Sequence, residues 1–151
     1  MADIDAAAAP QGVPPFHLAF LVRDLEEARG FYREVLGCGE GRSTSSWIDF
    51  DFYGHQIVAH LDPQAASRDA VATGAVDGHN VPVPHFGVVL GIAAWEALVE
   101  RLRRHGVHFE MEPTTRFKGL PGEQSTTFFK DPSGNAIEIK AFRTLESLFA
   151  R

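Results

Sequence analysis

Cysteine is almost absent from this chain of 151 residues, which contains only Cys38. A single cysteine excludes an intrachain disulfide and fits a reducing compartment, so we expect a cytoplasmic location and a buried, structural role for the thiol. The chain also lacks any apolar run long enough to cross a bilayer. Residues 1–11 include acidic residues and an alanine run but no basic region, which is unlike a signal peptide. We expect residues 1–13 to form a flexible tail.

Basic residues are in deficit as well. Lysine and arginine number 14 against 20 acidic residues, which gives a formal charge of −6, and no basic cluster stands out. This balance argues against nucleic acid or an anionic membrane surface as a partner. The remaining composition, 44% hydrophobic and 23% charged, is ordinary for a globular protein. At this length we expect one compact domain, or two half-domains that share a core.

Two segments of the chain show the same order of patterns. In the first, an apolar run over residues 16–22 precedes Asp24, a good helix N-cap with Glu27 three residues later. Apolar residues then recur at helical spacing, and strands are predicted over 47–51 and 56–61.

The second segment repeats this order. An apolar run over residues 84–90 is followed by a helical stripe over 95–102. Further strands are predicted over 107–111, 126–130 and 136–142. Between the two segments, residues 63–82 are rich in Ala, Gly, Asp and Pro and are interpreted as a linker.

The repeated order predicts an α+β fold built from two βαβββ modules, over residues 14–62 and 83–151. A four-stranded sheet with one helix cannot bury both of its faces alone. We therefore expect the two sheets to enclose a cleft.

One carboxylate interrupts an apolar strand near the C-terminus. The turn formers 131–135 lead directly into that strand, where alternation puts Glu138 and Lys140 on one face. A carboxylate in mid-strand is costly to bury unless it is paired or bound to a metal. His17 and His85, at the starts of the two opening apolar runs, could supply the rest of a metal site.

These motifs resemble the vicinal oxygen chelate superfamily, which includes glyoxalase I, extradiol dioxygenases, methylmalonyl-CoA epimerase and fosfomycin-resistance transferases. The resemblance rests on the His17 strand with residues 23–32, and on the hairpin over 131–138. Residues 117–124 are similar to those of small predicted extradiol-type dioxygenases. The resemblance implies two modules that form an open eight-stranded, barrel-like sheet around one divalent metal ion.

The resemblance also implies which residues bind the metal. The family's ligand on the first strand of each module corresponds to His17 and His85, and its glutamate on the last strand corresponds to Glu138. Glyoxalase I and the epimerase add a fourth ligand, at a position that Val58 occupies here. His60, two residues later on the same face, is a candidate replacement or catalytic group.

Two imidazoles and one carboxylate are typical of non-haem Fe(II) oxygenases, so Fe(II) is the favoured metal, while Mn, Ni, Co or Zn would also suit this set. A small substrate with vicinal oxygens would displace bound water. We expect a dioxygenase. The alternatives are a glyoxalase- or epimerase-type lyase or isomerase and a small-molecule-binding resistance protein. Ordinary catechol cleavage is disfavoured, because residues 126–129 contain no tyrosine.

A Pro- and Gly-rich loop is predicted over residues 112–124, ahead of the last hairpin. Its cations, Arg116 and Lys118, are candidate contacts for an anionic substrate, and Glu123 is a candidate general base. The expected partners are a small-molecule substrate and a second copy of the chain in a homodimer.

Overall fold

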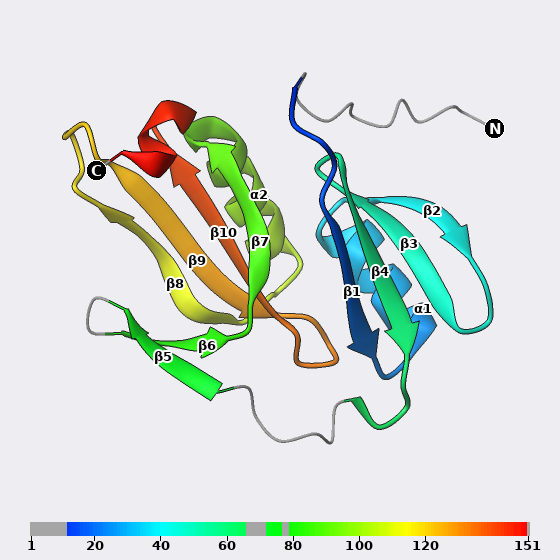
Figure 1. Cartoon of the computed structure of the whole chain (residues 1–151). Coiled ribbons are helices and arrows are strands. Elements are labelled where there is room, and N and C mark those ends of the chain that lie inside the picture. Colours follow the sequence, from blue (N-terminus) through cyan, green and yellow to red (C-terminus); the bar gives the residue numbers. More distant parts are fainter. Residues whose placement is uncertain (1–11, 66–71, 77–78, 151) are drawn as a thin grey trace. The chain divides into compact units, whose positions relative to one another are not determined.

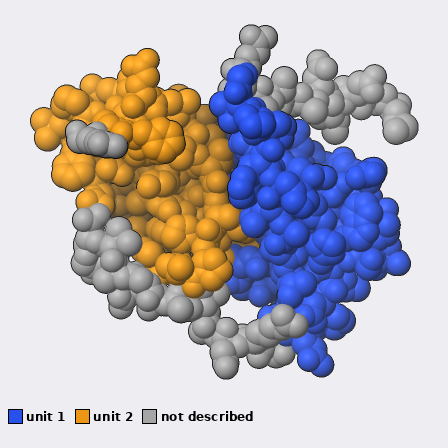
Figure 2. Space-filling model, viewed as in Figure 1, with its two compact units in different colours: residues 1–68, 132–135 blue, residues 69–131, 136–151 orange. Residues whose placement is uncertain are grey.

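The computed structural model describes residues 12–65, 72–76 and 79–150. Of the predicted tail, only Gly12 and Val13 belong to these residues; the rest of it lies outside them. The chain divides into two compact units, residues 1–68 with 132–135 and residues 69–131 with 136–151 (Figure 2). We refer to them as unit 1 and unit 2. None of the described helices is both long and apolar enough to span a membrane.

Unit 1 contains the first βαβββ module (Figure 1). Its sheet has the strand order β1-β4-β3-β2, in which β1 runs parallel to β4 and the other neighbours are antiparallel. The elements are β1 (His17–Val22), α1 (Leu25–Arg29), a π-helical turn (Gly30–Val35), β2 (Gly39–Ser43), β3 (Trp47–Phe52) and β4 (His55–Leu61).

The predicted N-cap begins the helical segment of unit 1. Asp24 Oδ1 accepts a hydrogen bond from the Glu27 N–H at 2.7 Å, which satisfies one of the free donors at the helix start. The segment then buries Tyr32, whose ring centroid lies 5.3 Å from that of Phe20 and 5.1 Å from that of Phe50. Aromatic contacts from β1 and β3 therefore fix the helical segment on one face of the sheet.

Unit 2 contains the second module, with strand order β7-β10-β9-β8 and β7 parallel to β10. Its elements are β7 (Phe86–Gly91), α2 (Ile92–Arg104), β8 (Phe109–Arg116), β9 (Gln124–Lys130), β10 (Ala136–Phe142) and a 3₁₀ turn (Leu145–Phe149). Both βαβββ modules are thus confirmed.

Helix α2 packs against strands β10 and β7 on one face of this sheet (Figure 1). Its predicted apolar stripe, Trp95 to Leu102, is buried, and the Trp95 indole N–H donates to the Ile139 carbonyl at 2.9 Å. Because side chains alternate along a strand, Glu138 faces away from the helix. Its surroundings are therefore the residues of the opposite face, which include polar side chains and Phe128.

The two strand ladders place Val58 and Glu138 at equivalent positions. Val58 pairs with Ala19 on β1, and Glu138 pairs with Gly87 on β7. His17 and His85 each precede that partner by two residues. The correspondence inferred from the repeat therefore agrees with the observed register.

Three details differ from the sequence-based expectations. The predicted linker contains an antiparallel hairpin of β5 (Ala72–Val76) and β6 (His79–Val83). The sequence pattern does not predict strand β2. Strand β8 continues to Arg116, so the predicted loop over 112–124 shrinks to 117–123. In keeping with the open arrangement expected, the sheets are not closed into a barrel: in the described part of the chain, each module keeps its own four-stranded sheet.

Candidate metal centre

The structure brings two of the three predicted ligands together in unit 2. His85 precedes β7, and Glu138 lies in the middle of β10, which pairs with β7. His85 Nε2 lies 3.0 Å from Glu138 Oε2, and the two side chains are 27% and 14% exposed. The pair is sheltered but remains open to a ligand.

Hydrogen bonding fixes which nitrogen of His85 faces the carboxylate. Nδ1 lies 2.6 Å from the carbonyl oxygen of Pro82. A carbonyl oxygen only accepts, so Nδ1 carries the proton and the neutral ring presents the lone pair of Nε2. Two lone pairs would then meet between His85 and Glu138. A proton, carried by Nε2 or by the carboxyl oxygen, or a metal ion between the two atoms would remove this repulsion.

The distance and the supporting contacts suit a divalent metal. Two neighbouring ligands about 2.1 Å from an octahedral ion lie about 3.0 Å apart, which matches the Nε2–Oε2 separation of 3.0 Å. Metal-bound histidines donate their second N–H to a carbonyl or carboxylate, and ligating carboxylates accept further hydrogen bonds. Thr126 Oγ1 donates to Glu138 Oε1 at 2.7 Å. This donor set fits a metal.

The third predicted ligand, His17, lies in unit 1 at the start of β1. Its Nδ1 is 2.8 Å from Gln56 Oε1 on the paired strand β4. An amide oxygen only accepts, so Nδ1 donates and Nε2 of the exposed ring is left for another ligand. His17 and His85 therefore have the same tautomer and the same kind of support.

The other predicted site residues have separate places. Within the described residues, no three histidine, cysteine or acidic side chains are close enough to hold a metal together. His60 is exposed on β4, on the face of Val58. Glu123 accepts from Arg143 at 2.7 Å, and Lys118 is exposed in the loop 117–123. Arg116 lines the same cavity as His85 and Glu138.

That cavity, on the open face of the unit 2 sheet, has a volume of about 490 Å³. Small-molecule sites commonly measure about 300–1,000 Å³. Phe128 forms part of its wall and contacts His85 edge-on, with ring centroids 5.0 Å apart. Lys140 and Thr126 also line the cavity. The sequence pattern does not identify either residue as part of the site. Alternation along the strand does place Lys140 on the same face as Glu138.

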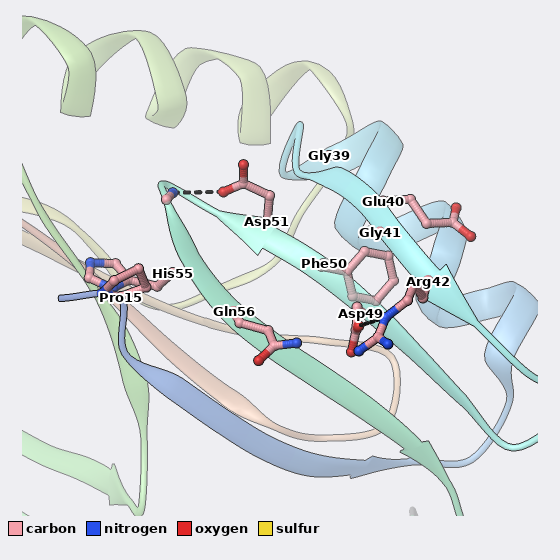
Figure 3. Close-up of a pocket in the computed structure, with 11 residues that line it drawn as sticks. Pro15, Gly39, Glu40, Gly41, Arg42, Asp49, Phe50, Asp51, His55 and Gln56 are labelled. Atoms are coloured by element: carbon pink, nitrogen blue, oxygen red, sulfur yellow. Dashed lines mark hydrogen bonds and ion pairs between the residues drawn. The ribbon is translucent and has the colours of Figure 1, made fainter. Parts of the chain in front are cut away.

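Unit 1 has a cavity of its own, about 410 Å³, next to β2 and β3 (Figure 3). Its carboxylates already have partners. Asp49 points toward Arg42 at 3.6 Å, and Asp51 accepts from the Gly54 N–H at 2.7 Å (Figure 3). Glu40 accepts from Arg29 at 3.0 Å.

Hydrogen bonds to Glu26 and then to Glu40 raise the pKa of Arg29. This arginine therefore stays charged at any physiological pH. We interpret the acidic residues of the unit 1 cavity as structural.

A sheet-and-helix module occurs twice, with a histidine at the start of the first strand in one copy and directly before that strand in the other. This arrangement defines a class of paired-module proteins. The family description Glyoxalase/Bleomycin resistance protein/Dioxygenase superfamily matches residues 15–139. The chain belongs to this superfamily. It includes many metal-dependent enzymes, which typically bind one divalent ion, and also resistance proteins without enzymatic activity.

Solved structures agree with this assignment. A glyoxalase/bleomycin resistance protein/dioxygenase from Alicyclobacillus acidocaldarius is 32% identical, with a TM-score of 0.70 over 90% of this chain and 96% of that one. A fosfomycin resistance protein from Listeria monocytogenes is 19% identical, with a TM-score of 0.64 over 92% and 98%. A second one, from Mesorhizobium loti, is 17% identical, with a TM-score of 0.60 over 94% and 100%. At these identities, the two fosfomycin resistance proteins show only that the fold is similar.

Removing the hydroxyl of Thr126 should weaken metal binding without unfolding the protein. In Thr126→Val, Glu138 Oε1 loses its donor, and the loss of such a supporting contact typically costs about 10–100-fold in metal affinity. Competition with a chromophoric chelator measures the change. Thr114→Val is the matched control, because Thr114 lines the same cavity but donates to the Glu112 carbonyl. Equal affinities in the two variants would contradict this supporting role for Thr126.

Proposed function

We propose that this chain is a metal-dependent enzyme in which His17, His85 and Glu138 hold one divalent ion, with Fe(II) favoured. The observation that carries the proposal is the His85–Glu138 pair, in which Nε2 lies 3.0 Å from Oε2 while Nδ1 contacts the Pro82 carbonyl. Support for His17 comes from its place in the repeat and from its Nδ1 contact with Gln56. Mn, Ni, Co or Zn would also suit this set.

The reaction that we propose is a dioxygenation of a small substrate with vicinal oxygens. Val58 stands at the ladder position equivalent to Glu138 and cannot bind a metal. Three protein ligands leave up to three positions of an octahedral ion for substrate and dioxygen. When bound, the ion would supply a Lewis acid for the substrate oxygens and, as Fe(II), redox chemistry toward dioxygen.

The chain's own groups would orient and bind the substrate. The Pro82 carbonyl holds the His85 ring, and Thr126 holds Glu138. Arg116 faces the cavity and would contact an anionic part of the substrate, and Lys118 in the following loop is a weaker candidate. His60 and Glu123 stay proposed proton carriers. Glu123 would have to give up its contact with Arg143 to act as a base.

Oxygen consumption by the Fe(II)-loaded protein tests the proposed reaction. We expect oxygen uptake with a substrate that has vicinal oxygens, and we expect ordinary catechols to react poorly. An oxygen electrode under air, compared with Ni, Co and Mn forms under nitrogen, gives the measurement. Activity of those metal forms without oxygen, together with none for Fe(II) in air, would replace dioxygenation by glyoxalase- or epimerase-type chemistry. Ligand binding without turnover by any form would favour a binding protein.

The partners and location follow from the family and the composition. Members of the superfamily bind small molecules and often form dimers. For this chain, the homodimer and the cytoplasmic location stay predictions.

A further inference from the structure

We propose that the unit 2 cavity holds an oxyanion of the substrate, such as a carboxylate, phosphonate or phosphate, with Lys140 and Arg116. This deepens the proposed function, because it gives the substrate class: a compound with an anionic group at one end and metal-binding oxygens at the other. The two cations are placed by the fold, independently of any metal.

Strand register sets the spacing between the cations and the metal ligands. Lys140 follows Glu138 by two residues on the same face of β10, which is a separation of about 7 Å along the strand. Lys140 pairs with Thr126, which itself lies opposite Thr114. Arg116 lies two residues further along β8 than Thr114, opposite Gln124 on β9. The cavity therefore runs from an imidazole–carboxylate end to a cationic end.

Lys140 lacks a carboxylate partner among the residues that the structure describes. Among those residues, its ammonium forms no hydrogen bond or ion pair, and it lies 5.9 Å from the centroid of the Phe142 ring. The nearby Glu138 is already engaged by His85 and Thr126. Lys140 is half-buried, and a partly desolvated cation without a counter-charge costs free energy. An anionic ligand would supply that charge.

Arg116 is held in place by its neighbour in the chain. Its guanidinium carbon lies 5.3 Å from the centroid of the Phe117 ring, within the range of a cation–π contact. Phe117 has a φ of 54°, a left-handed conformation that is unusual for a bulky residue and that often marks functional sites. The contact restricts the half-buried Arg116 at the edge of the cavity, which lowers the entropy cost of binding an anion.

Inorganic phosphate tests the cationic end without any metal. With the full chain in excess chelator, we expect phosphate at millimolar concentrations to shift the backbone amide resonances of Gln124 and Thr126. Lys140→Met and Arg116→Met should each weaken this binding about tenfold or more, the effect of losing one charge-assisted hydrogen bond. Lys130→Met is the matched control, because Lys130 is exposed on β9 and pairs with Glu110.

Two outcomes would overturn the inference in this experiment. One is a wild-type spectrum that phosphate leaves unchanged up to tens of millimolar. The other is equal phosphate affinity in the wild type and Lys140→Met. Neither outcome depends on metal binding, so a failure here is separate from a failure of the metal proposal. In the second outcome, phosphate would be an adventitious ion only, bound at the surface. It would shift resonances away from the cavity, and neither cavity variant would change its affinity.

A pair of vicinal diols then tests the two ends together. Under nitrogen, we expect the Fe(II)-loaded protein to bind 3,4-dihydroxybenzoate about tenfold more tightly than 4-methylcatechol, since only the first carries a carboxylate. Calorimetry measures both affinities. Lys140→Met should remove the preference and keep the binding of 4-methylcatechol. Equal binding of the two diols by the wild type would overturn the anion site and leave the metal proposal standing, whereas no metal-dependent binding of either diol would count against the metal proposal.

Discussion

His85→Ala should purify with little or no bound metal and should remain folded. The variant removes the imidazole that faces Glu138 at 3.0 Å, while the buried core of unit 2 is formed by other residues. Loss of a group that only supports a ligand already costs about 10–100-fold in affinity, so loss of the ligand itself should cost more than about 100-fold. Elemental analysis of protein purified without chelators measures retained metal, and circular dichroism checks the fold.

His105→Ala is the matched control for this experiment. His105 is exposed at the C-cap of α2 and does not line the cavity. Metal content in this control should equal that of the wild type. Glu138→Gln should reproduce the loss in His85→Ala, because an amide replaces the charged ligand. A stoichiometric metal ion in His85→Ala would disprove the proposed centre.

The same measurement of metal content distinguishes a proton from a metal ion as the group that lies between His85 and Glu138. If a proton alone lies between His85 and Glu138, the pair is a structural ion pair, and its loss leaves metal content unchanged. His17→Ala extends the argument to unit 1, since His17 is assigned by its place in the repeat. Reduced metal content in all three variants would support His17, His85 and Glu138 as metal ligands.

Much of the fold was predictable from the sequence, because in many segments the local preferences of the residues agree with the packing of the folded chain. Asp24 caps its helix as its side-chain chemistry predicts. The stripe from Trp95 to Leu102 is buried as its spacing predicts. Gly134 adopts a φ of 89° in the turn before β10, which few residues other than glycine or asparagine tolerate. These signals depend on a few neighbouring residues, so the sequence alone carries them.

Strand β2 was missed because its residues give no pattern of alternation. The segment Gly39–Ser43 is glycine-rich and polar, lies at the sheet edge and pairs only with β3, with a shift in register. Its conformation is set by the partner strand. The hairpin of β5 and β6 lies in the segment whose Ala, Gly, Asp and Pro content predicts a linker. Such segments become strands through pairing, which local propensity does not reveal.

The candidate site was predictable only in part, for a related reason. Glu138 and His85 stand out as polar residues in apolar runs. The roles inferred for Thr126 and Lys140 depend on which residue lies across β9 and β10, and a one-residue difference in register would reverse both faces. The loop predicted over 112–124 was too long because Pro113 and the threonines obscured β8. Arg116 is therefore a strand residue at the cavity and not a loop residue.

Gly87→Ala should destabilise the protein and weaken its metal binding, although it adds only one methyl group. A Cβ at this position would overlap the carbonyl oxygen of Glu138 and lie 2.6 Å from its carbonyl carbon. Both atoms belong to the backbone of the paired strand, so relief requires β7 and β10 to separate. At the equivalent ladder position, unit 1 carries Ala19 beside Val58. The requirement for glycine is thus particular to the strand pair that carries Glu138.

The expected loss of stability is about 3 kcal/mol, at the upper end of the usual cost of overpacking. For a chain of this size, that lowers Tm by roughly 6–12 °C. Thermal unfolding of the metal-free protein measures the stability, and chelator competition measures the displacement of Glu138. Gly122→Ala is the control, because a Cβ there meets no atom within 4 Å. A Gly87→Ala protein with wild-type Tm and metal affinity would mean that the two strands can separate freely. Register would then not hold Glu138 against His85, and the pair would have to be maintained by the bound ion itself.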